Sequence, residues 1–526
     1  MSAWIKRYQV FFACAAFLLA FIFQFRTFLW SGFPPSWNSM LATGASLDYL
    51  HLIPVQVRTL NSSFYARDYM VFHVTPLYPR FWRELTAFFS LRLCRDQIVG
   101  DWIISCLSFF VAAFGMGLLS YAISENILST GLSVLFLLAG GTDPAGQYFL
   151  AMGNFAVPHE QALSLFPWIL YFLVRRIKNP DMPPWEMALL ALAANIHAPT
   201  AIYMGLSLIS VYGLLPEARP PKNKASFLLI FLSLAAIIFG ALPTLLVLRT
   251  WNPPSANFFA WAFPPLYPIE GWRAFHHLRG LIIFFFLLRW PAIVFAFWAI
   301  ARPWRVLKDT KKRILLSASL PLSFLVLGRL FVLLFPFSPS LIMGEFRAFM
   351  PAILPLIPLS SEFWRPVESK KENILILILG IFLLIHFFPH SGWKTPQDPA
   401  HIQEYETDLS WQIKTLTPKN ALILTPDALV GLRAKSSRAV FGDSRALEML
   451  LSFDDKIEKF YWPLYEKLNA SYREQNWPEI LKIAAILKAD YAVLPANWNP
   501  CSEKKSHCEE IYKNRELALL HLRPRK

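Results

Sequence analysis

The distribution of hydrophobic residues divides the chain into a long apolar part and a shorter mixed part. Up to about residue 392, apolar runs follow one another with mostly short polar intervals. A straight transmembrane helix needs about 20 apolar residues, and about eleven runs approach this length. The pattern therefore predicts a polytopic α-helical membrane protein with about 11 transmembrane helices. The predicted crossings are 9–30, 102–123, 128–139, 162–174, 185–196, 200–215, 227–248, 281–300, 314–335, 346–359 and 374–388.

One long polar interval, residues 31–98, interrupts the apolar part and is called the first loop below. It contains two runs with helical spacing of apolar residues, one around 47–52 and one at 80–95. In the second run arginines alternate with the apolar positions, so one helix face is apolar and the other is charged. We expect both runs to be amphipathic helices that lie on a membrane surface rather than cross it.

The pattern changes after residue 392. Short apolar runs at 421–424, 439–441, 491–494 and 517–520 alternate with helical patterns, and charges of both signs are mixed among them. This alternation predicts a small α/β domain. We therefore expect two domains: a transmembrane domain at 1–392, which includes the first loop, and an α/β domain at 393–526.

Composition and charge agree with a membrane protein and indicate its orientation. The 526 residues are 55% hydrophobic and only 16% charged, which is too apolar for an ordinary soluble protein. The formal net charge of +15 comes from short basic clusters between apolar runs, so it predicts no nucleic-acid partner. If each run crosses once, these clusters share one side. The positive-inside rule then places the N-terminus in the cytoplasm and the α/β domain outside.

Cysteine usage adds one expectation. Cys501 and Cys508 flank a short polar segment of the α/β domain. They could close a small disulfide in an oxidising compartment, or they could be two free thiols.

Several short motifs accompany this order of elements. The sequences Leu-Asp and Arg-Asp stand at 47–48 and 67–68, Pro-His-Glu at 158–160 precedes an apolar run, and Asn-Ile-His-Ala-Pro at 195–199 separates two others. Thr-Pro-Lys-Asn at 417–420 opens the α/β domain. With one helix, a large loop, many further helices and a terminal α/β domain, the chain resembles the GT-C class of integral-membrane glycosyltransferases. More closely, it is similar to poorly characterised bacterial GT-C-like membrane proteins.

The resemblance implies a function and a location. GT-C enzymes transfer a sugar from a polyprenyl-phosphate-linked donor to an acceptor at the outer face of the membrane. We therefore expect membrane lipid and a lipid-linked sugar as partners, and a bacterial inner membrane as the location. No cofactor is predicted, because the first loop has no Asp-x-Asp metal signature, and a divalent metal remains an open question. The alternatives are a transporter of a lipid-linked or anionic solute, and a non-catalytic scaffold that binds an envelope polymer.

The chemistry suggests a base in the first loop. Sugar transfer needs a carboxylate beside the acceptor hydroxyl, because that hydroxyl must lose a proton as it attacks. Asp48, in apolar company, is the first candidate, and Asp68 is the second. The alternative is that Asp48 faces water or caps a helix, while Asp68 forms a surface ion pair with Arg67.

Other polar residues are candidates for binding the substrate. Cationic side chains stabilise the departing phosphate, and arginine suits this role. The histidine and glutamate candidates stand in the first loop or where helices are expected to reach the outer surface. The predicted substrate-binding residues are His51, Arg80, Arg83, His159, Glu160, His197 and Arg347.

Overall fold

The structure is a computed structural model in which the chain forms two compact units. It describes residues 47–139, 158–249, 308–333, 351, 354–361, 400–427, 429, 431–443, 447, 454–502 and 507–523. The helical unit comprises Met1–Pro35, Asp101–Leu242 and Phe263–Lys394, and the mixed unit comprises Ser36–Gly100, Pro243–Ala262 and Thr395–Lys526. The sequence placed the first loop with the transmembrane segments. In the structure the first loop packs with the C-terminal domain instead.

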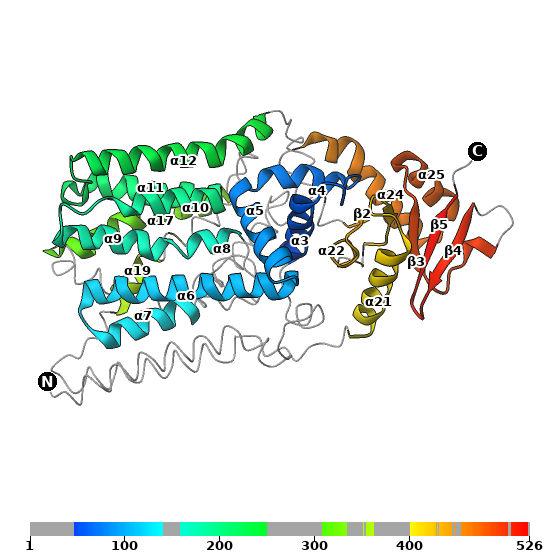
Figure 1. The fold of residues 1–526 in the computed structure, drawn as a ribbon, viewed down its shortest axis with the longest axis horizontal. Helices are drawn as coiled ribbons and strands as arrows, with labels where there is room; N and C mark the ends of the chain where they lie inside the picture. Colours follow the sequence, from blue (N-terminus) through cyan, green and yellow to red (C-terminus); the bar gives the residue numbers. More distant parts are fainter. Residues whose placement is uncertain are drawn as a thin grey trace. The chain divides into compact units, whose positions relative to one another are not determined.

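The helical unit is built from antiparallel helices. Helices α9, α10, α11 and α17 pack against one another side by side (Figure 1). The helices described in this part of the chain are α6 (Gln97–Ser124), α7 (Ile127–Ala139), α8 (Pro158–Leu163), α9 (Phe166–Lys178), α10 (Trp185–Ile196), α11 (Ala198–Leu214), η3 (Pro216–Ala218), α12 (Lys224–Arg249), α17 (Thr310–Leu333) and α19 (Leu356–Ser361).

One described helix meets the length and composition expected of a membrane span. Helix α6 is long and apolar enough to cross a membrane, while 185–196, 198–214 and 224–240 are shorter apolar helices. The predicted crossings at 9–30, 281–300 and 374–388 lie outside the described residues. The number of about 11 crossings therefore stays a prediction.

A buried ion pair joins α9 to α10. The side chains of Arg176 and Glu186 are 0% exposed, and their charged atoms lie 2.5 Å apart. Arg176 also donates to the carbonyl of Ala218 at 3.0 Å, and the hydroxyl of Tyr212 donates to Glu186. Because each charge has a partner, burial leaves neither group without compensation.

The mixed unit contains a five-stranded sheet with the strand order β2-β1-β3-β5-β4 (Figure 1). Strand β1 pairs in parallel with β2 and β3, whereas β5 pairs antiparallel with β3 and β4. Leu422 lies opposite Ala439, and Ile423 lies opposite both Val440 and Tyr491. The strands are β1 (Leu422–Leu424), β2 (Ala439–Phe441), β3 (Tyr491–Pro495), β4 (Cys508–Lys513) and β5 (Leu517–Leu522).

Helices cover this sheet and form its core. Leu409 and Ile413 of one helix pack against Ile423, Val493 and Leu519 of the strands, and all five side chains are fully buried. The helices are α21 (Ala400–Leu416), α22 (Leu432–Ser436), η6 (Ile457–Tyr461), α24 (Trp462–Arg473) and α25 (Trp477–Leu487), and a short turn η7 (Pro500–Ser502) precedes β4.

The first loop forms helices that pack within the mixed unit. Its second amphipathic run is α-helical and then continues as a π-helix. Trp82 on this helix is buried, whereas Phe81, Leu85 and Phe88 are about half exposed, so one face stays apolar and open. Contact of this face with lipid remains a prediction. The elements are α3 (Leu47–Leu60), α4 (Tyr69–Val74), η1 (Thr75–Leu77), α5 (Arg80–Ala87) and η2 (Phe88–Leu93).

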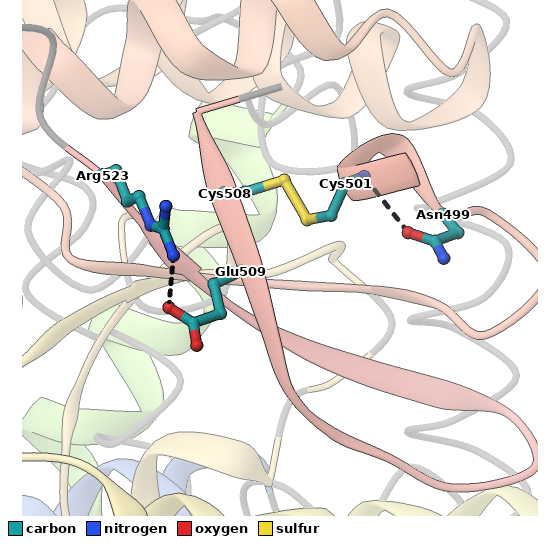
Figure 2. The surroundings of a disulfide bond; sticks show 5 residues. All are labelled: Asn499, Cys501, Cys508, Glu509 and Arg523. Carbon is teal, nitrogen blue, oxygen red and sulfur yellow. Dashed lines mark hydrogen bonds and ion pairs between the residues drawn. A yellow bond between two sulfur atoms is a disulfide. The ribbon is translucent and has the colours of Figure 1, made fainter. Parts of the chain in front are cut away.

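A disulfide joins Cys501 to Cys508, the pair that the sequence left open. It connects the turn η7 to the start of β4, with Cα atoms 5.5 Å apart (Figure 2). The side chain of Asn499 accepts a hydrogen bond from the backbone N–H of Cys501 at 3.1 Å. The ion pair between Arg523 and Glu509, at 2.9 Å, lies beside it at the sheet edge.

Candidate functional site

Asp68 of the first loop is buried within the mixed unit and is only 2% exposed. One carboxylate oxygen accepts a hydrogen bond from the backbone N–H of Val71 at 3.0 Å, which caps the start of α4. The other oxygen accepts from Nε of Arg433 at 2.8 Å and from the backbone N–H of Val440 at 3.1 Å. Both oxygens of Asp68 are therefore occupied by donors.

Arg433 of α22 connects this carboxylate to the rest of the C-terminal domain. Its guanidinium also binds Asp443 at 2.7 Å, and its backbone carbonyl accepts from the hydroxyl of Tyr65 at 3.0 Å. Burial alone would lower the pKa of Arg433, but the carboxylates of Asp68 and Asp443 outweigh it and raise the pKa. The arginine is thus a charged group held between two acids.

The same two side chains close the edge of the sheet. Strand β2 is an edge strand, and an open edge exposes backbone groups that can pair with another chain. At Val440 the N–H donates to Asp68 and the carbonyl accepts from Arg433 at 2.7 Å. Asp68 and Arg433 therefore occupy the place that a neighbouring strand would take.

This geometry assigns Asp68 a positioning role. We expected either a base or a surface ion pair with Arg67, but Arg67 pairs with Asp490 at 2.5 Å and donates to the carbonyl of Lys488. Asp490 in turn accepts from the backbone N–H of Leu422 at 2.9 Å. An Asp68 carboxylate that already accepts three hydrogen bonds is poorly placed to receive a proton from a substrate.

The side chains of three predicted site residues lie outside the described part of the structure. Asp48 and His51 belong to α3, which begins at Leu47, so they stand one helical turn apart near its start. Their side chains, and Arg347 as a whole, lie outside the described residues. Their roles remain predictions.

The two surface arginines of α5 differ in their contacts. Arg80 is well exposed and is held by Glu84 at 2.6 Å. Arg83 is half-buried, and its Nε donates to the carbonyl of Tyr78 at 3.1 Å. Burial lowers the pKa of Arg83 more than the nearby Glu84 raises it. Its terminal nitrogens have no hydrogen-bond partner in the described part of the chain, so Arg83 is the better candidate for binding a phosphate.

The three described residues among those predicted in the helical unit gather where α8 meets α10 and α11. His197 separates α10 from α11, and its Nδ1 lies 2.7 Å from the hydroxyl oxygen of Thr200. The rings of His159 and His197 are 6.0 Å apart, centre to centre. Glu160 is buried, and one of its carboxylate oxygens has no hydrogen-bond partner among the described residues. The structure thus brings two of the three predicted side chains into direct contact.

A small pocket in the mixed unit was not predicted. Its volume is about 90 Å³, and it is lined by side chains of the first loop and of the C-terminal domain. Gly442, directly after β2, is required here, because its φ is +137° and a Cβ atom would meet the carbonyl oxygen of Thr425. The main lining residues are Arg67, Asp68, Tyr69, Phe441, Asp443 and Tyr461. Among the described residues, no cluster of three or more His, Cys, Asp or Glu could hold a metal.

Comparison with known proteins gives a result at the level of the fold. No family profile and no curated protein sequence matches the chain. Among solved structures, the apo oligosaccharyltransferase of Archaeoglobus fulgidus is similar, with a TM-score of 0.53 and 11% identity over 94% of this chain and 70% of that one. The chain has the fold of the GT-C glycosyltransferases.

A second structure of the same oligosaccharyltransferase, AglB, agrees. It is a complex with an inhibitory peptide and a dolichol-phosphate, and it matches with a TM-score of 0.50 and 10% identity over 95% of this chain and 71% of that one. The GT-C fold is a polytopic membrane fold with a C-terminal domain, so the expected fold class is confirmed at that level and the membrane location is supported. At such low identity the likeness concerns the fold alone.

Proposed function

We propose that the chain is a glycosyltransferase that moves a sugar from a polyprenyl-phosphate-linked donor to an acceptor at the outer face of a membrane. The observation that carries this proposal is the GT-C fold over almost the whole chain, which it has in common with an oligosaccharyltransferase that binds dolichol-phosphate. Fold alone does not fix chemistry, so the roles of the residues are argued from the site.

The proposed reaction is a displacement at the anomeric carbon of the donor sugar. The acceptor hydroxyl oxygen forms a bond to that carbon, the bond from the carbon to the lipid phosphate oxygen breaks, and the hydroxyl proton passes to a base. Asp48, near the start of α3, is the proposed base. Negative charge grows on the departing phosphate, and Arg83, whose terminal nitrogens have no partner among the described residues, is the proposed group that stabilises it.

Asp68 has a supporting role in this proposal. Asp68 ends the segment that connects α3 to α4. It fixes this point of the chain because it caps α4 and pairs with Arg433. A base on α3 acts only if α3 is held in place, since a displacement of about 1 Å can reduce a rate about a hundredfold. Asp68 therefore acts through the position of the first loop and does not touch the reacting atoms.

We further propose that the N-terminus is cytoplasmic and that the mixed unit lies outside a bacterial inner membrane. The disulfide between Cys501 and Cys508 supports this orientation, because disulfides persist in oxidising compartments and are rare in the cytosol. A phosphatase reporter fused after Lys394 should be active in the periplasm.

The test uses the purified full-length chain in lipid nanodiscs with a panel of polyprenyl-phosphate sugars. We expect turnover with at least one donor, and a loss of about a hundredfold or more in Asp48→Asn, because positioned bases contribute that much. Glu466→Gln, which changes an exposed acid on α24 outside the pocket lining, is the control and should retain full activity. Undiminished turnover by Asp48→Asn would exclude Asp48 as the base. Solute uptake without turnover would favour the transporter alternative, and neither activity would favour the scaffold.

A further inference from the structure

The pocket of the mixed unit has aromatic walls. The rings of Tyr69 and Tyr461 are 4.0 Å apart and inclined by 32°, and Phe441 lies 6.3 Å from Tyr461. All three line the pocket, together with Gly442, whose missing side chain leaves room beside them. Aromatic faces of this kind attract weakly polar C–H groups, because their π-electrons carry negative charge. The C–H groups on one face of a sugar ring are such partners.

Charged groups also line this pocket, but each of them already has a partner. Arg67 pairs with Asp490, and Arg433 pairs with both Asp68 and Asp443. An anionic ligand would have to break one of these pairs to find a cation, whereas a neutral ligand would not. Paired charges can still exchange hydrogen bonds with hydroxyl groups. The pocket therefore suits a neutral ligand rich in hydroxyls.

The sheet edge beside the pocket argues against a peptide ligand. Extended peptides commonly bind by adding a strand to an open sheet edge. On β2 the backbone N–H and carbonyl of Val440 are already bonded to Asp68 and Arg433. A peptide would therefore find no free backbone partners at this position.

The hydroxyl groups of the two tyrosines carry no charge at neutral pH. The Tyr69 hydroxyl donates to Asp454. Burial, with a smaller effect of Asp454, raises the pKa of Tyr461 to about 12, so its phenol stays protonated at neutral pH. Both aromatic walls are thus neutral rings with a polar end.

We propose that this pocket binds one neutral sugar unit of the acceptor, packed against the ring pair that Tyr69 and Tyr461 form with each other. That the sugar belongs to an acceptor rests on the proposed glycosyltransferase function. Binding of a sugar to the pocket does not require that function. The first loop and the C-terminal domain would both contact the acceptor, because each contributes one of the two tyrosines.

The experiment measures binding by saturation-transfer NMR and calorimetry on the full-length protein in nanodiscs. The probes are methyl glycosides of glucose, galactose, mannose and N-acetylglucosamine, with glucuronic acid and glucose 6-phosphate as anionic counterparts. We expect saturable binding of at least one neutral glycoside and none of the anions. Tyr461→Ala should weaken it about tenfold or more, and Tyr461→Phe, which keeps the ring, should weaken it less.

The controls separate binding from folding and from catalysis. Trp411→Ala removes an exposed aromatic side chain on α21 outside the pocket and should bind the glycoside normally. If Tyr461→Ala lowers the thermal midpoint, Leu487→Trp tests the site by filling the pocket from another wall. The binding measurement needs no turnover, so a failure of the transfer proposal leaves it valid.

Three results would overturn the inference: no saturable binding of any neutral glycoside, preference for the anionic probes, or equal binding by the wild type and Leu487→Trp. Any of these could occur while transfer is intact. In a transfer assay with a working acceptor, the Tyr461→Ala variant should raise KM for that acceptor and leave kcat nearly unchanged.

Discussion

Two buried ion pairs, one in each unit, stabilise the chain in different ways. Arg176 and Glu186 join consecutive helices of the helical unit and lie only ten residues apart. Arg433 and Asp68 join segments of the mixed unit that are separated by 365 residues. For a flexible chain, closing the longer loop costs about 3 kcal/mol more in entropy. The second pair therefore needs additional contacts to offset this cost.

Those additional contacts are backbone groups of a strand. Arg176 binds the carbonyl of Ala218 and so satisfies one backbone group. Arg433 and Asp68 together satisfy both backbone groups of Val440, and Asp68 also caps α4. The comparison suggests that the first pair closes a local helix contact, whereas the second replaces a missing strand.

The largest expected effect is that of Arg433→Ala. It leaves Asp68 and Asp443 buried without their cation, which should cost about 3–5 kcal/mol of stability. Thermal unfolding of the purified protein and limited proteolysis of residues 47–100 would measure the loss. Arg523→Ala, which breaks an exposed pair, should change stability by less than about 1 kcal/mol. Equal stability of the two variants would show that the Arg433 pair is not structural.

Replacing each pair with apolar residues should separate the two roles. Asp68→Leu with Arg433→Met and Asp443→Asn removes the three charges but leaves the N–H and carbonyl of Val440 without partners, at a cost of about 2 kcal/mol or more. The second variant combines Arg176→Met, Glu186→Leu and Tyr212→Phe. It removes the buried pair and leaves only the carbonyl of Ala218 without this partner, so the loss of stability should be smaller. Thermal midpoints of the two multiple variants provide the comparison. A larger loss of thermal stability in the Arg176 variant would contradict the roles assigned to the two pairs.

Asp68→Asn should have a moderate effect. The Asp68 carboxylate faces three donors, and an asparagine must turn its own N–H₂ group toward at least one of them. We expect a loss of about 1–3 kcal/mol and a reduction in sugar transfer smaller than that of Asp48→Asn. Transfer assays and thermal unfolding test both parts. If Asp68→Asn abolished transfer in a fully stable protein, a catalytic role for Asp68 would return.

Double replacement of Cys501 and Cys508 by serine should have the most local effect. The bond closes a very short loop, so its removal should cost about 2 kcal/mol in the chain-entropy model. The loss should be confined to the β4 region and leave proteolysis of the first loop unchanged. Mass spectrometry of unreduced protein should detect the bond, and two alkylatable thiols would contradict it.

The strands that the sequence predicted are those with continuous apolar runs. The runs predicted at 421–424, 439–441, 491–494 and 517–520 correspond to strands β1, β2, β3 and β5, because they lie in the buried middle of the sheet or at its covered edge. Strand β4 was missed. Its residues are mostly polar, and most of them are partly or fully exposed at the edge of the sheet. The sequence therefore has no continuous apolar run that would predict a strand.

The site shows a similar limit. The Asp68 side chain was expected to pair with its neighbour Arg67, yet its partner is 365 residues away. Sequence periodicity indicates which face of a helix or strand is buried, but it does not say which distant segment covers that face. The aromatic pocket was missed for the same reason, because Tyr69 and Tyr461 are brought together only by the tertiary fold.

The long separation between Asp68 and Arg433 also has a consequence during synthesis. Chains emerge from the ribosome at about 5–20 residues per second, so Arg433 appears roughly 20–70 seconds after Asp68. Throughout that interval the first loop has been made and its carboxylate has no arginine to bind. The loop can adopt its final packing only after Arg433 and the helices encoded before it have been translated, so the C-terminal domain completes the packing of the first loop.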